Sequence, residues 1–164
     1  MKDHSRSYEK TIEFINTHNP FLKENGLAIT ALSDGHACAE LNATASLTNI
    51  YGMVHGGVLA SLADMAAGVC ATADGGQVVT LSSSMNCLSA AKPGLLTAEA
   101  SRIHAGKSTG VYTVEIFDET GKRIAQGTFT MFFLHDKFQG FSVLQENEKR
   151  FGSEPDPESS SDPE

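Results

Sequence analysis

Hydrophobic and polar residues follow two distinct periods along this chain, and one stretch is apolar on every side. From Val58 to Ala73 the sequence holds a single charged residue, Asp64, over a length suited to a helix. Ala, Leu and Met dominate this run, and they are strong helix formers. Because a helix that is apolar all round is buried in its domain, the run predicts a long, buried central helix.

Most of the remaining apolar residues alternate with polar ones, which is the period of a half-buried β-strand. The predicted elements are, in order, a short amphipathic helix over 8–17 that stops near Asn19-Pro20, a capping turn over 21–25, strands over 27–32 and 36–42, a loop over 43–53, the central helix, a turn over 74–76, and strands over 77–88, 94–105, 109–117 and 122–134. The economical arrangement is an α+β fold in which one antiparallel β-sheet wraps around the long central α-helix.

The length of 164 residues predicts one domain, which we place at residues 1–137 together with its N-terminal helix. Residues 138–164 form a C-terminal extension. It begins with a few apolar residues that could dock, becomes polar from Gln145, and ends in GSEPDPESSSDPE. Because that composition is typical of disorder, most of the extension is expected to be an acidic, solvated tail.

Charge and composition narrow the functional classes. The net charge is −8, and five of the acidic residues fall within 151–164, so a basic surface for nucleic acid is not expected. Asp64 interrupts the one apolar run long enough to suggest a membrane span, and the N-terminus lacks the apolar segment of a signal peptide. The three cysteines are widely spaced and indicate reduced thiols. We therefore expect a cytoplasmic protein without a metal or cofactor and without membrane or nucleic-acid partners.

The acid in the apolar run is the first candidate for chemistry. Burying a lone carboxylate costs several kcal/mol, so Asp64 needs either a partner or a function. Gly56 and Gly57 stand at the start of the same helix, where free N–H groups and the helix dipole attract negative charge. A carbonyl oxygen placed there would be polarised, and an oxyanion would be stabilised.

The spacing of these residues also bears on assembly. Eight residues separate Gly56 from Asp64 in the sequence, which is about 12 Å along a helix. One carbonyl group cannot contact both within a single chain. Two antiparallel copies of the helix would bring Asp64 of one chain to Gly56 of the other, so the spacing predicts a dimer with two shared sites.

The motif Asn49-x-x-Gly52-x-x-His55-Gly56-Gly57, followed by Asp64 in the same helix, resembles the hotdog-fold acyl-CoA thioesterases of the PaaI type. Later stretches agree with the same family, namely 92–94, 106–107 and 121–128, and the resemblance spans roughly 14–134. It implies hydrolysis of an aryl- or fatty-acyl-CoA to free acid and CoA by a homodimer or homotetramer. Other hotdog thioesterases, including a naphthoyl-CoA group, carry Glu at the helix position, so Asp64 favours the PaaI type.

The resemblance also implies roles for individual residues. The Gly56 N–H would polarise the thioester carbonyl, and Asp64 from the partner subunit would act as general base or nucleophile. Asn49 would position the nucleophilic water or the acid. Thr80 on the next strand would contact that water, with Ser82 as the alternative.

Three further positions are candidates for the same site. By the resemblance, His55 would steady the thioester or its loop. From the residues themselves, Gly57 lacks a side chain and would allow a ligand to approach the backbone closely, and Lys107 would contact a CoA phosphate. Plainer readings remain open for every candidate. Asp64 could be a structural acid, the glycines could serve helix packing, Asn49 could cap the turn before Gly52, and His55, Thr80 and Lys107 could be ordinary loop, strand and surface residues. At the level of the whole protein, the alternative is a non-catalytic acyl-CoA-binding hotdog protein, either a ligand sensor or a structural subunit.

Overall fold

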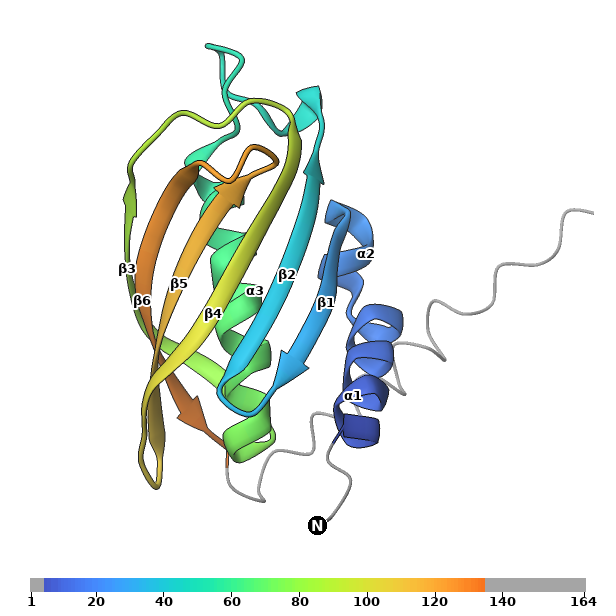
Figure 1. The fold of residues 1–164 in the computed structure, drawn as a ribbon, viewed down its shortest axis with the longest axis vertical. Coiled ribbons are helices and arrows are strands. Elements are labelled where there is room, and N and C mark those ends of the chain that lie inside the picture. The colour runs from blue at the N-terminus through green and yellow to red at the C-terminus, as the bar shows by residue number, and fades with distance from the viewer. Residues whose placement is uncertain (1–4, 135–164) are drawn as a thin grey trace, which may run out of the picture.

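The computed structural model describes residues 5–134, which form one antiparallel sheet, a long helix in its concave face and a helical pair outside it (Figure 1). The elements are α1 (Ser5–His18), α2 (Pro20–Asn25), β1 (Leu27–Ser33), β2 (His36–Ala43), a 3₁₀ turn (Ala45–Leu47), α3 (Gly56–Gly75), β3 (Val78–Cys87), β4 (Gly94–Ala105), β5 (Thr109–Asp118) and β6 (Arg123–Phe133). The extension over 138–164 lies outside the described residues. The predicted fold class and element order are confirmed.

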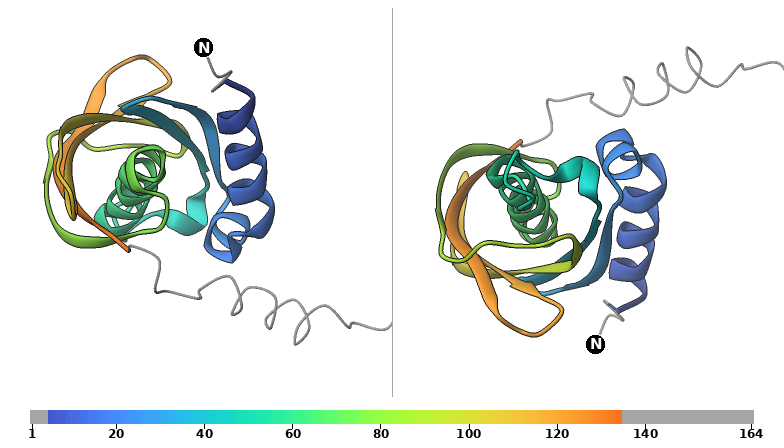
Figure 2. Two further views of the ribbon diagram at one scale, coloured as in Figure 1. Left: turned by 90° about the horizontal axis from the view of Figure 1, so that it is seen from below. Right: turned by 90° about the horizontal axis from the view of Figure 1, so that it is seen from above.

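The six strands run in the order β1-β2-β4-β5-β6-β3, and each neighbouring pair is antiparallel. Figure 2 shows that the sheet curls around α3, so one face of each strand meets the helix. The alternation is clearest in β5, where Gly110, Tyr112, Val114 and Ile116 are buried and their neighbours are half-exposed. The two-residue period read from the sequence therefore corresponds to a helix-facing and an outward-facing row.

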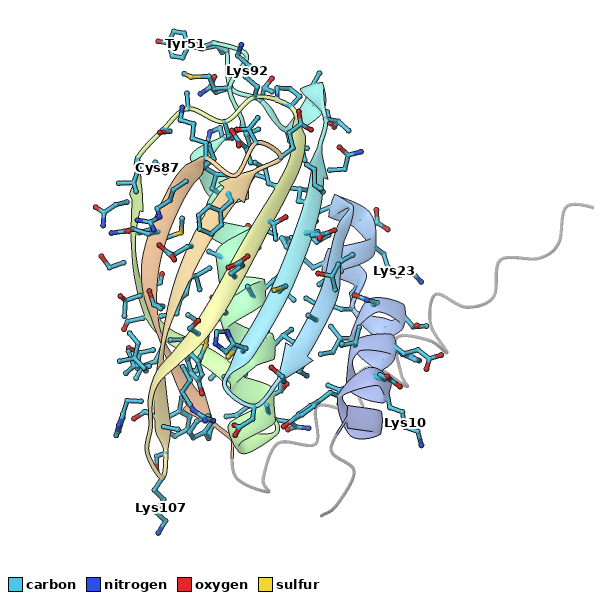
Figure 3. All side chains as sticks on the ribbon, in the orientation of Figure 1. Lys10, Lys23, Tyr51, Cys87, Lys92 and Lys107 are labelled. Atoms are coloured by element: carbon cyan, nitrogen blue, oxygen red, sulfur yellow. The ribbon has the colours of Figure 1, made fainter. Side chains whose placement is uncertain are left out.

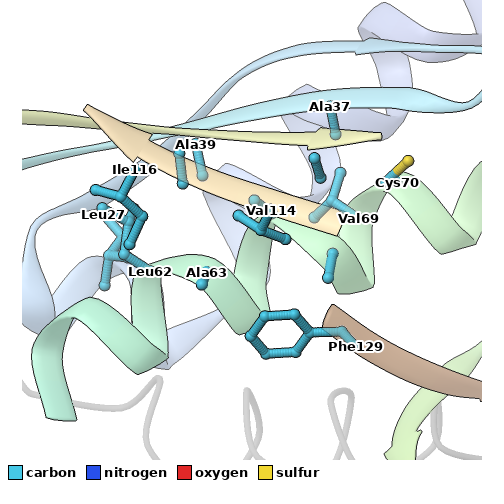
Figure 4. Close-up of a cluster of buried hydrophobic side chains, with 14 of the residues drawn as sticks. Leu27, Ala37, Ala39, Leu62, Ala63, Val69, Cys70, Val114, Ile116 and Phe129 are labelled. Carbon is cyan, nitrogen blue, oxygen red and sulfur yellow. The ribbon is translucent and has the colours of Figure 1, made fainter. Parts of the chain in front are cut away.

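Helix α3 is the centre of the core and contacts all six strands. Figure 4 shows Leu62, Ala63, Val69 and Cys70 of the helix among apolar side chains of the sheet. By length and composition alone, Gly56–Ala73 could cross a membrane. Here 44% of that segment is buried, and the contacts of α3 with the sheet account for its apolar character.

One strip of α3 is not covered, which corrects the expectation of a helix buried all round. Gly57 and Ala60 are exposed, and Ser61, Asp64 and Gly68 are half-buried, whereas the residues between them reach the core. The residues of this strip, which we call the open strip, are all small apart from Asp64. Among the described residues, no charged or polar side chain is fully buried.

The N-terminal helices cover the outer side of β1. The Asn16 side chain donates to the carbonyl oxygen of Ile29 at 2.9 Å and accepts from the Ile29 N–H at 2.8 Å. The residues predicted as a capping turn instead form the short helix α2. Its N-cap, Asn19, accepts hydrogen bonds from the N–H groups of Phe21 and Leu22, and Gly26 ends it in a left-handed conformation. Capping and the buried Leu22 therefore turn this segment into a helix.

Candidate active site

The loop before α3 is organised by Asn49. Its side-chain oxygen accepts hydrogen bonds from the N–H groups of Tyr51 at 2.9 Å and Met53 at 3.2 Å. Its own N–H donates to the Met53 carbonyl oxygen at 2.7 Å. In a single chain, Asn49 thus shapes the turn that delivers the chain to α3, as the capping reading expected, and its oxygen does not contact Asp64.

His55 is the N-cap of α3. Its Nδ1 atom accepts a hydrogen bond from the Gly57 N–H at 3.1 Å. Because Nδ1 is the acceptor, a neutral ring carries its proton on Nε2. His55 therefore satisfies one of the free N–H groups of the helix start and keeps Nε2–H as a donor.

The N–H group of Gly56 is the first of the helix. The N-cap residue His55 accepts hydrogen bonds from the N–H groups that follow it, but not from this one. The His55 carbonyl oxygen accepts from the N–H groups of Val58 and Leu59, and the His55 ring accepts from Gly57. Within residues 5–134, no acceptor is found for the Gly56 N–H. A Cβ atom at this position would meet one side-chain atom within 4 Å, the Cys87 sulfur at 4.0 Å. Gly56 is also exposed in a single chain, so a ligand can approach its backbone.

Asp64 has a direct partner on β3. The Thr80 hydroxyl donates a hydrogen bond of 2.6 Å to the Asp64 carboxylate, and its oxygen also lies 3.5 Å from the Met131 sulfur. Asp64 is half-buried and lies in the open strip. The structure therefore brings together the acid and the strand threonine that the sequence singled out, and it leaves one side of the carboxylate open.

A bulge in β3 separates the two hydroxyl residues considered for this position. The register of β3 against β6 shifts between Thr80 and Ser82. Thr80 pairs with the buried Met131, whereas Ser82 pairs with Thr130, which lies on the outward-facing row. Because the extra residue reverses the alternation, Ser83 takes the helix-facing row beyond the bulge and Ser82 does not.

β3 lies beside α3 with its end at the helix start. Cys87, the last residue of β3, is next to Gly56, and Thr80, near its beginning, is bonded to Asp64. Sequence reasoning did not select Cys87 as a site residue. The alternation of β3 could have pointed to Cys87 as a helix-facing residue. The bulge after Thr80 shifts that alternation by one residue, so counting from Thr80 in the sequence places Cys87 on the wrong face.

The lysine candidate lies elsewhere in a single chain. Lys107 stands at the tip of the β4–β5 hairpin, at the end of the molecule opposite Tyr51 and Lys92 (Figure 3). Lys92 follows Ala91, whose carbonyl oxygen accepts a hydrogen bond of 2.8 Å from the Val54 N–H, next to His55. Within one chain, Lys92 is therefore adjacent to the backbone that is hydrogen-bonded to the segment before α3, whereas Lys107 is not. In the part of the chain that the structure describes, no cluster of three or more His, Cys, Asp or Glu side chains could hold a metal ion.

This fold and this motif define a class of protein: a sheet wrapped around a central helix that opens on a His-Gly-Gly turn. The sequence profile of the Thioesterase superfamily matches residues 51–125. The chain belongs to this superfamily, as a PaaI-type hotdog thioesterase, and is a thioester hydrolase.

The relatives support the same assignment. The chain is 37% identical over 100 residues to the 1,4-dihydroxy-2-naphthoyl-CoA hydrolase of Listeria monocytogenes, a match covering 59% of this chain and 81% of the relative. It is 35% identical over 107 residues to the acyl-coenzyme A thioesterase PaaI of Escherichia coli, covering 63% and 74%. The structure of E. coli PaaI superposes with a TM-score of 0.73 at 28% identity, over 77% of this chain and 92% of that one.

A third similar protein was solved with a ligand. A hypothetical thioesterase from Streptococcus pneumoniae, in a structure with coenzyme A, superposes with a TM-score of 0.62 at 36% identity. The match covers 65% of this chain and 86% of that one.

Proposed function

We propose that this protein hydrolyses acyl-CoA thioesters to a free acid and CoA. The observation that carries the proposal is the hydrogen bond between the half-buried Asp64 carboxylate and the Thr80 hydroxyl, in the same helix whose first residue, Gly56, is exposed. Relatives named as CoA hydrolases and a similar structure with bound CoA support CoA as the thiol part.

In this mechanism the thioester carbonyl oxygen accepts from the Gly56 N–H, where the helix dipole favours the charge that develops in the transition state. Asp64 either removes a proton from water as the water attacks the carbonyl carbon, or attacks that carbon itself and forms an anhydride that water then cleaves. In the first route the proton taken by Asp64 passes to the sulfur as the C–S bond breaks, and CoA leaves as the thiol. In the second route the C–S bond breaks as the anhydride forms and CoA leaves as the thiolate, which is protonated by a proton released when water cleaves the anhydride. Thr80 holds the carboxylate in position through its hydrogen bond, and the His55 Nε2–H is available to the substrate.

The open strip of α3 supports a dimer with shared sites. Gly57, Ala60, Ser61 and Gly68 allow a second helix to approach closely, and Asp64 lies among them. The outer edge of β3 supports the same interface, because among the described strands β3 pairs with β6 alone and exposes Val79 and Leu81. Long unpaired edges are normally covered in native proteins. An antiparallel partner on this face brings each Asp64 to the other chain's Gly56.

Replacing Asp64 tests the proposed function. Asp64→Asn keeps the shape and can still accept the Thr80 hydrogen bond, but it can neither take a proton nor supply an anionic oxygen. We expect kcat for a panel of acyl-CoAs to fall about 100-fold or more, because general acid–base roles contribute on the order of 10² to 10⁴. CoA release followed with a thiol-reactive dye is the assay.

The matched control is Asp34→Asn, which makes the same change at an exposed acid paired with Arg102. It should leave turnover unchanged. Activity retained in Asp64→Asn, with a lower melting temperature, would make Asp64 a structural acid. Binding of acyl-CoA without turnover by the wild type would favour the non-catalytic alternative.

A further inference from the structure

A cavity of about 160 Å³ lies beside the start of α3, and neither Asp64 nor Thr80 lines it. Its walls come from α2, from β1 and β2, from the 3₁₀ turn and from the first two turns of α3. The apolar walls are Phe21, Leu27, Leu41, Leu47 and Val58. Leu27 and Leu41 are part of the buried core, whereas Phe21 is 45% exposed. The cavity thus has a fixed floor and an outer wall formed by the phenyl ring of α2.

The polar residues of this cavity are already hydrogen-bonded within their own helices. The Ser61 hydroxyl donates to the Gly57 carbonyl oxygen at 3.0 Å, and the Asn25 side-chain amide donates to the Phe21 carbonyl oxygen at 2.9 Å. No charged side chain lines the cavity. It therefore suits an apolar group and not the phosphates or the adenine of CoA.

The cavity borders the start of α3, next in the chain to the residue proposed to bind the thioester carbonyl. Gly57 lines it, and Gly57 directly follows Gly56. Consecutive Cα atoms are about 3.8 Å apart. A carbonyl group bound at the Gly56 N–H therefore lies one residue away from a residue that lines the cavity, within reach for its acyl substituent.

We propose that this cavity holds the acyl group of the substrate and that Phe21 sets the upper limit of its size. The inference rests on the proposed function, which it extends to the acyl side of the substrate. A cavity of about 150 Å³ lined by Leu, Ile and Phe binds one benzene ring in another protein. The cavity here matches one aromatic ring or an aliphatic chain of similar volume.

The packing of α2 holds Phe21 in a fixed position at the outer side of the cavity. Asn19 caps this helix, and Leu22, next to Phe21, is 1% exposed and anchors the helix to the core. The backbone that carries Phe21 is therefore fixed while its ring faces the cavity. A change of side chain at this one position alters the size of the cavity and leaves its floor in place.

The test compares kcat/KM for benzoyl-CoA, which has one ring, and 2-naphthoyl-CoA, which has two. The wild type should favour the one-ring substrate. Phe21→Ala should shift the ratio towards the two-ring substrate by about 10-fold or more, since a change of one methylene in an apolar pocket already changes discrimination by roughly 10- to 200-fold. Phe21→Trp should shift the ratio in the opposite direction, so the two variants check each other if one folds poorly.

Phe14→Ala is the matched control, because Phe14 is a comparably exposed phenylalanine on α1 that does not line this cavity. Its ratio should equal that of the wild type. If the protein turns over acyl-CoAs but neither change at Phe21 alters the ratio of kcat/KM for the two substrates, the cavity is not the acyl pocket. The proposed function would then stand. Absence of turnover for every acyl-CoA with the wild-type protein would overturn both.

Discussion

Shared active sites can be tested by mixing two inactive variants. Gly56 and Asp64 lie eight positions apart in α3, and this spacing is about 12 Å along the axis. Reacting atoms must approach to about 3–3.5 Å. A single chain therefore cannot present both groups to one thioester, whereas an antiparallel partner can.

The perturbation combines Asp64→Asn in one chain with Gly56→Leu in the other. A leucine at Gly56 adds a bulky side chain beside the N–H of that residue, in a space where the Cys87 sulfur, 4.0 Å away, is the one side-chain atom near a Cβ atom. In a mixed dimer, one site carries both changes and the other carries neither. Random pairing of equal amounts makes about half of the dimers mixed. Each mixed dimer keeps one of its two sites, so the unsorted mixture should regain about a quarter of the wild-type activity and purified mixed dimers about half.

The matched control pairs Asp64→Asn with Thr80→Val. Asp64 and Thr80 are bonded within one chain at 2.6 Å, so each mixed dimer has one change in each of its sites. Mixing should then return no activity above the mean of the parents. The assay is CoA release by dimers purified through two different tags. If tag-purified Asp64→Asn/Gly56→Leu dimers stay inactive, the acid and the N–H donor serve the same chain, and the argument from the helix spacing is wrong.

Two further predictions concern stability. Hydrogen bonds from the Thr120 hydroxyl first, and then from the N–H groups of Lys122 and Thr120, lower the pKa of Asp118 in the β5–β6 turn. A lowered folded-state pKa contributes stability above the unfolded-state pKa that is lost as pH falls through the folded-state value. Asp118→Ala should therefore lower the melting temperature at pH 7, and the difference from the wild type should disappear in acid. If the variant still melts at a lower temperature than the wild type at the lowest pH, the hydrogen bonds to the ionised carboxylate are not the cause. Removal of residues 145–164 should leave the melting temperature and turnover nearly unchanged, because that composition buries little apolar area; a large fall in melting temperature would mean that the tail docks.

The sequence determined most features that depend on local spacing, although it predicted a turn where α2 forms a helix. The alternating runs gave the strands, the apolar run gave α3, and the His-Gly-Gly turn gave a helix start with an open N–H. Thr80 and Asp64 could be singled out as a pair through resemblance, and the structure joins them by a hydrogen bond. These features survive because the period of an element and the chemistry of its ends are set by neighbours in the chain.

The tertiary structure decided which faces meet. The sequence analysis expected α3 to be buried on every side, and the position of the open strip is set by where the curled sheet ends at β1 and β3. The bulge after Thr80 moves Ser82 to the outward-facing row, and a single extra residue of this kind leaves no periodic trace. The cavity beneath Phe21 exists because a predicted turn folds as a helix over the Leu27–Leu41 floor. Lys107 lies far from the helix start because hairpin length, and not sequence distance, places it at the opposite end of the sheet.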